Sequence, residues 1–175
     1  MTIKVGDTLP DATIREFIEV EGNGCSVGPN KFQVAGLMRG KRIVIFGLPG
    51  AFTPTCSAKH VPGYLQHFEA LKASGVDEIW CVSVNDAAVM GAWGRDQKTT
   101  GKIRMIADGN AEFTTKMGLQ IDLSAGGMGL RSRRYSMLVE DGVVKTLNLE
   151  APGKFEVSDA QTMLGQVTGA GRVSG

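Results

Sequence analysis

Residues 48–62 read LPGAFTPTCSAKHVP, and they follow the apolar run of residues 42–47, RIVIFG. Such an apolar run is typical of a buried β-strand. Thr53 is a favourable helix N-cap, and Pro is favoured at the next position because its missing N–H would be unpaired there in any case. The stretch therefore predicts a strand, a short loop and a helix that begins with Pro54.

Cys56 falls within the first turn of this predicted helix. A sulfur atom there meets unpaired backbone N–H groups and the positive end of the helix dipole. These surroundings favour the thiolate, which is the reactive form of cysteine. A small buried cysteine in a core helix is the ordinary alternative. The local sequence leaves both interpretations open.

The composition indicates one globular domain over residues 1–175, with 42% hydrophobic and 21% charged residues. We expect residues 168–175, TGAGRVSG, to be a frayed tail. The net charge of +1 gives no bulk attraction to nucleic acid or to an anionic membrane. No apolar run reaches the roughly 18 residues of a membrane span. Without a secretory signal, and with three scattered cysteines, we expect a cytoplasmic protein with reduced thiols.

Predicted strands and helices alternate along the chain, which indicates an α/β fold. The strands at 42–46 and 78–84 should be parallel neighbours, and Cys56 then lies beyond the carboxyl end of a strand, where ligands bind in such sheets. The other predicted elements are a strand at 12–20, a loop at 21–30, a helical turn at 32–38, a helix at 54–73 interrupted by Pro62-Gly63, a helix at 87–93 capped by Asn85-Asp86, a strand at 104–107, a helix at 112–117, a flexible glycine-rich loop at 126–129, a hairpin of strands at 135–139 and 143–149 joined through Asp141-Gly142, and a helix at 158–167 capped by Ser158.

Two histidines follow Cys56, with His60 four residues later and His67 seven further on. These three side chains could bind a metal from one helix face. A zinc site, however, usually takes ligands from more than one element, and Pro62-Gly63 breaks the face between the histidines, so we expect no metal. His60 alone is consistent with a partly exposed ring bonded to the backbone, or with a neighbour of the thiolate that orients the pocket.

The other two cysteines have ordinary explanations. Cys25 lies in a turn-rich loop with no cation nearby, and we expect it to have no function. Cys81 lies in an apolar predicted strand, where a buried core thiol is the simpler interpretation. The alternative is that Cys81 forms a disulfide with Cys56 after local unfolding, because the two positions need not satisfy disulfide geometry as folded.

Three arginines, Arg131, Arg133 and Arg134, cluster before the predicted strand at 135–139. A solvated strand edge is the default interpretation of such a cluster. In the alternative interpretation, one of the three arginines reaches Cys56 and stabilises the negative charge of its sulfur. Sequence periodicity does not choose between the two.

Four segments of the chain resemble the peroxiredoxins, and most closely the peroxiredoxin-5-like (type II) branch. The segments are Pro49-x-x-x-Thr53-x-x-Cys56 with its extension GAFTPTCSAKHVPG at 50–63, VGDTLP at 5–10, VSVND at 82–86 and RYSM at 134–137. The resemblance covers about residues 3–167 in consistent order. It implies a thioredoxin-like fold, with a central mixed β-sheet flanked by helices. It also implies a cofactor-free, homodimeric thiol peroxidase that reduces hydrogen peroxide and alkyl hydroperoxides.

The same resemblance implies a role for each site residue. Cys56 is the peroxidatic cysteine, Thr53 hydrogen-bonds the sulfur and the peroxide, and Pro49 shields the pocket. Arg134 matches the family arginine, because it directly precedes the aromatic-Ser-Met unit. Attack on the peroxide leaves Cys56 as a sulfenic acid, which a thiol must reduce before further oxidation traps it.

One departure from the family pattern concerns how Cys56 is regenerated. Some type II members carry a resolving cysteine after the hairpin, but residues 150–158, EAPGKFEVS, contain none. Cys81 matches a position that other members use instead. Reduction by glutathione or a glutaredoxin needs Cys56 alone, whereas a transient Cys56–Cys81 disulfide would suit thioredoxin. We favour the one-cysteine cycle.

Overall fold

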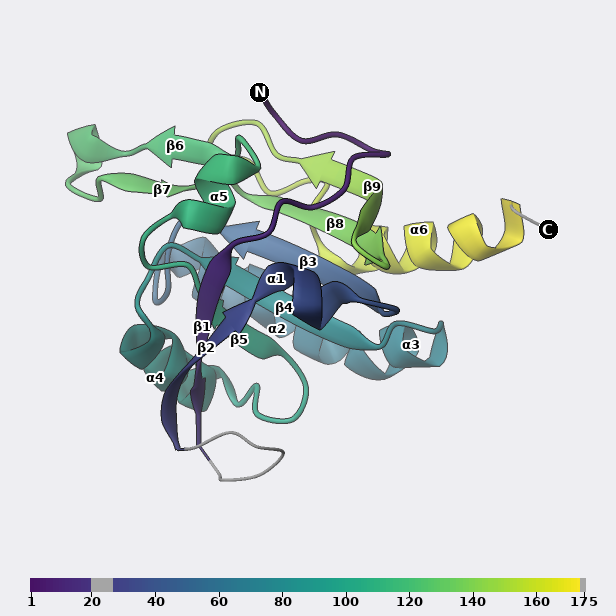
Figure 1. Cartoon of the computed structure of the whole chain (residues 1–175), viewed down its shortest axis with the longest axis horizontal. Helices are drawn as coiled ribbons and strands as arrows, with labels where there is room; N and C mark the ends of the chain where they lie inside the picture. The colour runs from purple at the N-terminus through teal and green to yellow at the C-terminus, as the bar shows by residue number, and fades with distance from the viewer. Residues whose placement is uncertain (20–26, 174–175) are drawn as a thin grey trace.

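Three apolar strands form the middle of the sheet in the computed structural model of the chain, which describes residues 1–19 and 27–173 (Figure 1). They are β3 (Arg42–Leu48), β4 (Glu78–Ser83) and β8 (Tyr135–Glu140). β3 pairs in parallel with β4, as predicted, and antiparallel with β8. Both faces of these strands are covered, so they are buried almost throughout, and their sequences run apolar without alternation.

Four further strands complete a seven-stranded mixed sheet in the order β2-β1-β5-β4-β3-β8-β9. They are β1 (Thr13–Ile18), β2 (Gly28–Gln33), β5 (Arg104–Ala107) and β9 (Val143–Leu149). The β8–β9 hairpin turns through Asp141 and Gly142, whose φ angles of 49° and 81° are the positive values that a two-residue type I′ turn requires. The predicted hairpin and the thioredoxin-like fold class are confirmed.

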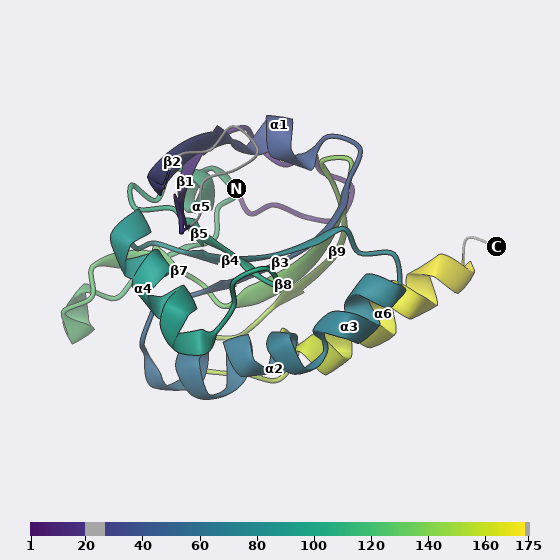
Figure 2. The ribbon, with the colours of Figure 1, turned by 90° about the horizontal axis from the view of Figure 1, so that it is seen from below.

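Helices cover both faces of the sheet (Figure 2). One face packs against α2 (Val61–Gln66), α3 (Phe68–Ala73), α4 (Ala87–Gln97) and α6 (Ala160–Val173), and the other against α1 (Val34–Met38) and α5 (Glu112–Lys116). Alternate residues of β3 divide between the two layers, with Val44 and Phe46 on the α2 side and Ile43 and Ile45 on the α1 side. Within the described residues, no helix is long and apolar enough to cross a membrane.

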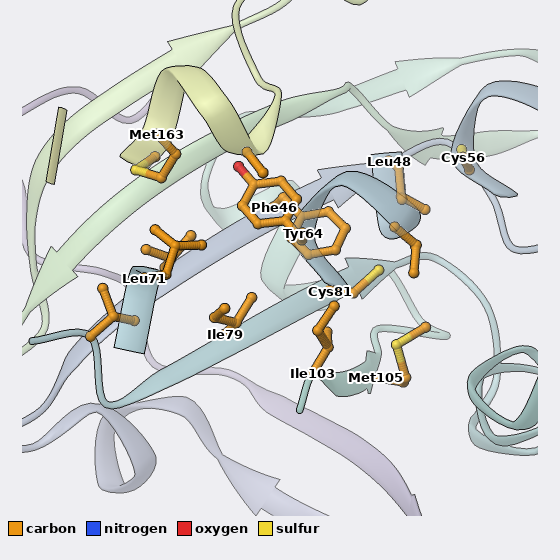
Figure 3. Close-up of a cluster of buried hydrophobic side chains, with 14 of the residues drawn as sticks. Phe46, Leu48, Cys56, Tyr64, Leu71, Ile79, Cys81, Ile103, Met105 and Met163 are labelled. Carbon is orange, nitrogen blue, oxygen red and sulfur yellow. The ribbon is translucent and has the colours of Figure 1, made fainter. Parts of the chain in front are cut away.

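The layer on the α2 side contains two of the cysteines, Cys56 and Cys81, and both thiols are free (Figure 3). Phe46 of β3 stacks on Tyr64 of α2, with the ring centroids 4.2 Å apart and the planes nearly parallel. This stack joins the strand that precedes Cys56 to the helix that follows it. The positions on either side of the cysteine are thereby held by the core.

The structure corrects two predictions in the first half of the chain. Residues 28–33 form the edge strand β2 rather than the end of a loop and a helical turn, and only Val34–Met38 is helical. Pro62 does not interrupt the helix, because helical residues run from Pro54 through the wider turn Cys56–His60 and on through α2 to Gln66, with Pro62 directly after that turn. The break falls at His67, between α2 and α3.

The second half of the chain differs from the prediction at four points, the first being that α4 runs to Gln97 rather than ending at residue 93. The glycine-rich loop belongs to an antiparallel arm, β6 (Gln120–Asp122) and β7 (Leu130–Ser132), with a short turn of 3₁₀ helix between them, and the arm projects from the body (Figure 1). The last helix is capped by Asp159, whose carboxylate accepts from the Thr162 N–H at 3.1 Å, and not by Ser158. α6 continues to Val173, so residues 168–173 are helical rather than frayed.

Candidate active site

A five-residue loop after β3 leads into the helix that carries Cys56. The helix begins at Pro54, and the Thr53 carbonyl accepts from the Ser57 N–H at 2.9 Å, so Thr53 occupies the predicted N-cap position. Its hydroxyl does not cap the helix but donates back to the Gly50 carbonyl at 2.7 Å. The side chain therefore closes the loop on itself, and its oxygen lone pairs face away from that bond.

Cys56 begins a π-helical turn, Cys56–His60, in which the Val61 N–H bonds to the Cys56 carbonyl five residues earlier. Such turns are rare and are found mostly at functional sites. The wider turn places Cys56 and His60 on the same side of the helix, and both residues are fully buried at 0% exposure. The sequence predicted that these two residues share a face, but not the π-turn or the burial of His60.

Arg134, directly before β8, reaches both of these residues. Its Nη2 donates to the Cys56 sulfur at 3.2 Å, and its Nη1 donates to His60 Nδ1 at 2.8 Å. Because a guanidinium can only donate, Nδ1 must be the unprotonated nitrogen of the His60 ring. The proton is then on Nε2, which donates to the Ser158 carbonyl at 3.1 Å. Burial, and next the positive charge of Arg134, lower the pKa of His60 to about 3, so the ring is neutral at ordinary pH.

Glu150 and Ser158 hold the far side of this chain of hydrogen bonds. The Glu150 carboxylate, only 3% exposed, accepts from the backbone N–H groups of Glu156, Val157 and Ser158 and from the Ser158 hydroxyl, at 2.7 to 2.9 Å. Burial alone would raise the pKa of Glu150, but these hydrogen bonds outweigh it and lower the pKa. The Glu150 N–H also donates to the Arg134 carbonyl at 3.0 Å. We call this set of contacts the Glu150 clasp.

Three other side chains hold the loop and the helix start in place. Asn85 accepts from the Ala51 N–H at 3.0 Å, and the Trp93 indole donates to the Ser57 hydroxyl at 3.0 Å. Arg131 donates to the Pro49 carbonyl at 3.3 Å, and a Cβ atom added to Gly50 would lie 2.9 Å from its guanidinium. Glycine at position 50 thus allows Arg131 to pack against the loop.

The structure brings together most of the residues that the sequence singled out. Cys56, His60 and Arg134 are in contact, and Thr53 and Pro49 belong to the adjoining loop. Of the other two arginines, Arg131 bonds to the loop and Arg133 donates to the Glu150 backbone carbonyl at 3.3 Å. None of the three arginines is the merely solvated residue that was the default prediction.

Two of the remaining candidates lie away from this centre. His67 turns to the Gly63 carbonyl of its own helix, at 3.0 Å from Nδ1. Among residues 1–19 and 27–173, no three His, Cys, Asp or Glu side chains gather as metal ligands would. Cys25 lies outside the described residues.

Cys81 lies in the middle of β4, directly opposite Phe46 of β3 in the sheet register. Its thiol is fully buried, and this burial raises the pKa of the thiol well above its ordinary value. Figure 3 shows Cys81 close to the Phe46–Tyr64 stack and Cys56 well apart from it, beyond Leu48. The folded arrangement therefore matches the interpretation of Cys81 as a core thiol.

Sequence reasoning missed the supporting residues. Glu150 stands in a segment that drew attention only because it contains no cysteine, and a single acidic residue after a strand carries no motif. Asn85 and Asp86 were expected to cap α4, and Asp86 does so by accepting from the Val89 N–H at 2.8 Å. The contact of Asn85 with the active-site loop joins segments far apart in the chain and leaves no local signal.

Comparison with known proteins places this geometry among related molecules. Residues 4–164 match the Redoxin family model. Peroxiredoxin-2B of Arabidopsis thaliana is 46% identical over 162 residues, covering 93% of this chain and 96% of that protein. The structure of reduced Prx3 from Vibrio vulnificus in complex with hydrogen peroxide is 49% identical with a TM-score of 0.87, covering 95% of this chain and 99% of the other. A Burkholderia cenocepacia structure, described provisionally as a thioredoxin reductase, is 65% identical with a TM-score of 0.93, covering 94% and 97% of the two chains.

Proposed function

The chain belongs to the Redoxin family and to the peroxiredoxins, which are thiol-dependent peroxidases, and we propose that Cys56 is the residue that attacks the peroxide. The observation that carries this proposal is the 3.2 Å hydrogen bond from Arg134 Nη2 to the Cys56 sulfur at the start of a buried helical turn. A guanidinium at that distance can donate to the negative charge that is shared by the sulfur and the peroxide oxygens during the attack. Of the two cysteines in the described residues, Cys56 is the one that an arginine contacts.

The reaction transfers one oxygen atom from the peroxide to the sulfur. The thiolate attacks one peroxide oxygen, an S–O bond forms, and the O–O bond breaks with release of hydroxide or alkoxide. Negative charge spreads over the sulfur and both oxygens in the transition state. Fixed donors aimed at that charge supply most of the acceleration in reactions of this kind. Arg134 is such a donor, and the backbone N–H groups at the helix start are others.

The neighbouring residues take supporting roles in this proposal. The Thr53 proton is committed to the Gly50 carbonyl, so the Thr53 oxygen can accept a hydrogen bond from the peroxide. Pro49 shields the pocket beside Thr55 and Arg134. His60 is a positioning residue, because it accepts from Arg134 and so fixes the direction of the guanidinium toward Cys56.

Regeneration of Cys56 follows a one-cysteine cycle in which glutathione or a glutaredoxin reduces the sulfenic acid. The absence of cysteine from residues 150–158 and the core position of Cys81 support this cycle. A thioredoxin-dependent cycle through Cys81 would require local unfolding of β4 or of the helix start.

We further propose that the protein is a cytoplasmic homodimer. Light scattering of the purified protein measures the mass of the assembly and so tests the dimer directly.

Peroxide consumption with glutathione as the reductant tests the proposal. Cys56→Ser should abolish turnover, and Cys81→Ser, a matched change of the other core thiol, should keep it. Turnover by Cys56→Ser at the wild-type rate would overturn the assignment of the nucleophile. Loss of glutathione-dependent turnover in Cys81→Ser, with its fold intact by circular dichroism, would overturn the one-cysteine cycle.

A further inference from the structure

Two buried hydroxyl groups on the α5 side of the sheet stand out from the other buried polar atoms. Among the buried side-chain nitrogen and oxygen atoms of residues 1–19 and 27–173, only Tyr135 Oη and Thr114 Oγ1 have no hydrogen-bond partner. Both residues are fully buried. A hydroxyl that is buried without a partner destabilises the folded state, so buried polar groups are almost always paired, either with protein or with ordered water. The two hydroxyls therefore point to a bound molecule that pairs with them.

The ring of Tyr135 lies across the backbone of β3. Tyr135 is opposite Gly47 in the β8–β3 register, and a Cβ atom added to Gly47 would lie only 2.1 to 2.8 Å from the ring and its hydroxyl. Gly47 is in turn opposite Val82 of β4, and Val82 is opposite Ile106 of β5. The glycine thus lets the Tyr135 hydroxyl pass from β8 over β3, toward β4 and β5.

Asp108, directly after β5, connects this hydroxyl to Thr114. The Asp108 side chain is buried, and its carboxylate accepts from the N–H groups of Phe113 at 3.1 Å and Thr114 at 2.8 Å, which fixes the start of α5. Burial, and next the negative charge of Asp108, raise the pKa of Tyr135. Such an effect requires the phenol and the carboxylate to be near one another. We call the place where Asp108, Thr114 and Tyr135 meet the Asp108 site.

We propose that one buried water molecule binds at the Asp108 site and bridges the hydroxyls of Tyr135 and Thr114. Each hydrogen bond of a water is about 2.8 Å long, so a water joins two polar atoms that are about 5 Å apart and cannot bond directly. Buried waters typically make about three hydrogen bonds. Each carboxylate oxygen of Asp108 accepts one backbone N–H bond and keeps a further lone pair, so Asp108 can be the third partner.

The Asp108 site lies under the strand ends that hold the active site, on the other side of the sheet. Tyr135 directly follows Arg134 but packs in the layer on the α1 side. The Asp108 N–H donates to the Ser83 carbonyl at 2.9 Å, and the Ser83 hydroxyl donates to Asn85, which holds the loop before Cys56. The water therefore connects the start of β8 to α5 and to the end of β5. Its binding does not depend on the reaction of Cys56.

Urea denaturation of single and double variants tests the bridge. Tyr135→Phe and Thr114→Val should each raise the equilibrium constant for unfolding about 5- to 30-fold, because each removes a paired hydroxyl. Since both hydroxyls hold the same water, the double variant should show clearly less than the product of the two changes. Unpaired hydroxyls predict the opposite sign, because phenylalanine or valine would remove an unfavourable buried oxygen. Unchanged or increased stability in either single variant would overturn the proposal, and so would a double variant that equals the product.

Thr115→Val is the matched control for the change on α5. Thr115 is the exposed neighbour of Thr114 in the same helix, so its variant should unfold like the wild type. An equal loss of stability in Thr114→Val and Thr115→Val would assign the loss to the helix and overturn the role of the Thr114 hydroxyl.

A crystal structure of the full chain at high resolution gives a second, independent measurement. It should show one ordered water within about 3.2 Å of both Tyr135 Oη and Thr114 Oγ1, and this water should be lost in Tyr135→Phe. A direct hydrogen bond from Tyr135 to Asp108 or Thr114, or a site without a water in the wild type, would overturn the proposal. A water that persists unchanged in Tyr135→Phe would also overturn the bridge, because Tyr135 would then not hold it.

Discussion

Replacing Arg134 by methionine tests how the site activates Cys56. Methionine is also unbranched along its stem, but it is shorter and has no donor, so the variant loses the bonds to Cys56 Sγ at 3.2 Å and to His60 Nδ1 at 2.8 Å. At an effective dielectric constant of about 20, unit charges at that separation interact by about 5 kcal/mol. Only the part of this energy that grows as charge spreads to the peroxide oxygens accelerates the reaction. Losing one such donor typically slows a reaction by about 10²- to 10³-fold, or about 2.7 to 4 kcal/mol.

The assay is the second-order rate constant for oxidation of the reduced protein by hydrogen peroxide in stopped flow. Arg134→Lys is the matched control, because the ammonium keeps the charge but lacks the planar fork of donors that meets Cys56 and His60 in the wild type, and we expect an intermediate rate. Urea denaturation should also show Arg134→Met losing about 1 to 3 kcal/mol, since His60 Nδ1 is left buried without a donor. A peroxide rate for Arg134→Met within about threefold of the wild type would refute the reasoning.

Three further predictions concern the residues around this arginine. Thr53→Val should lower the peroxide rate constant by about 10- to 100-fold in the same stopped-flow assay, with Thr53→Ser near the wild type, because serine keeps the hydroxyl that closes the loop. Since burial and Arg134 lower the pKa of His60 to about 3, the neutral ring stabilises the fold above pH 6.5, and this contribution is lost as the pH falls from about 6.5 to about 3. The free energy of unfolding of His60→Gln should therefore fall less steeply than that of the wild type across this window, and parallel curves would contradict the buried neutral ring. Glu150→Gln should speed hydrogen exchange at the N–H groups of residues 156–158, because the amide presents its own donors to them, whereas Glu156→Gln, an exposed neighbour, should leave that exchange unchanged.

The central fold could be predicted because its signals are local. The runs that became β3, β4 and β8 are apolar along their whole length, as strands covered on both faces must be. Asp141-Gly142 marked the hairpin through the positive φ angles that its turn needs. Residues 28–33 gave no such signal, because GPNKFQ looks like a turn and becomes the edge strand β2 only by pairing with β1.

The reacting centre could be predicted in part. Cys56 and Thr53 share one local motif, and Arg134 was singled out from its neighbours by the resemblance of the RYSM segment. The π-turn and the Glu150 clasp could not be predicted. They depend on contacts between residues 56–60, 134 and 150–158, which the fold brings together across separations of up to 98 residues. A single sequence contains no periodicity that reports such contacts.

The most direct test of the central claim identifies the sulfur that peroxide oxidises. The reduced protein is mixed with one equivalent of hydrogen peroxide in the presence of dimedone, which traps sulfenic acids, and the peptides are then analysed by mass spectrometry. We predict a dimedone adduct on the peptide that contains Cys56. An adduct on Cys25 or Cys81 with Cys56 unmodified would contradict the account.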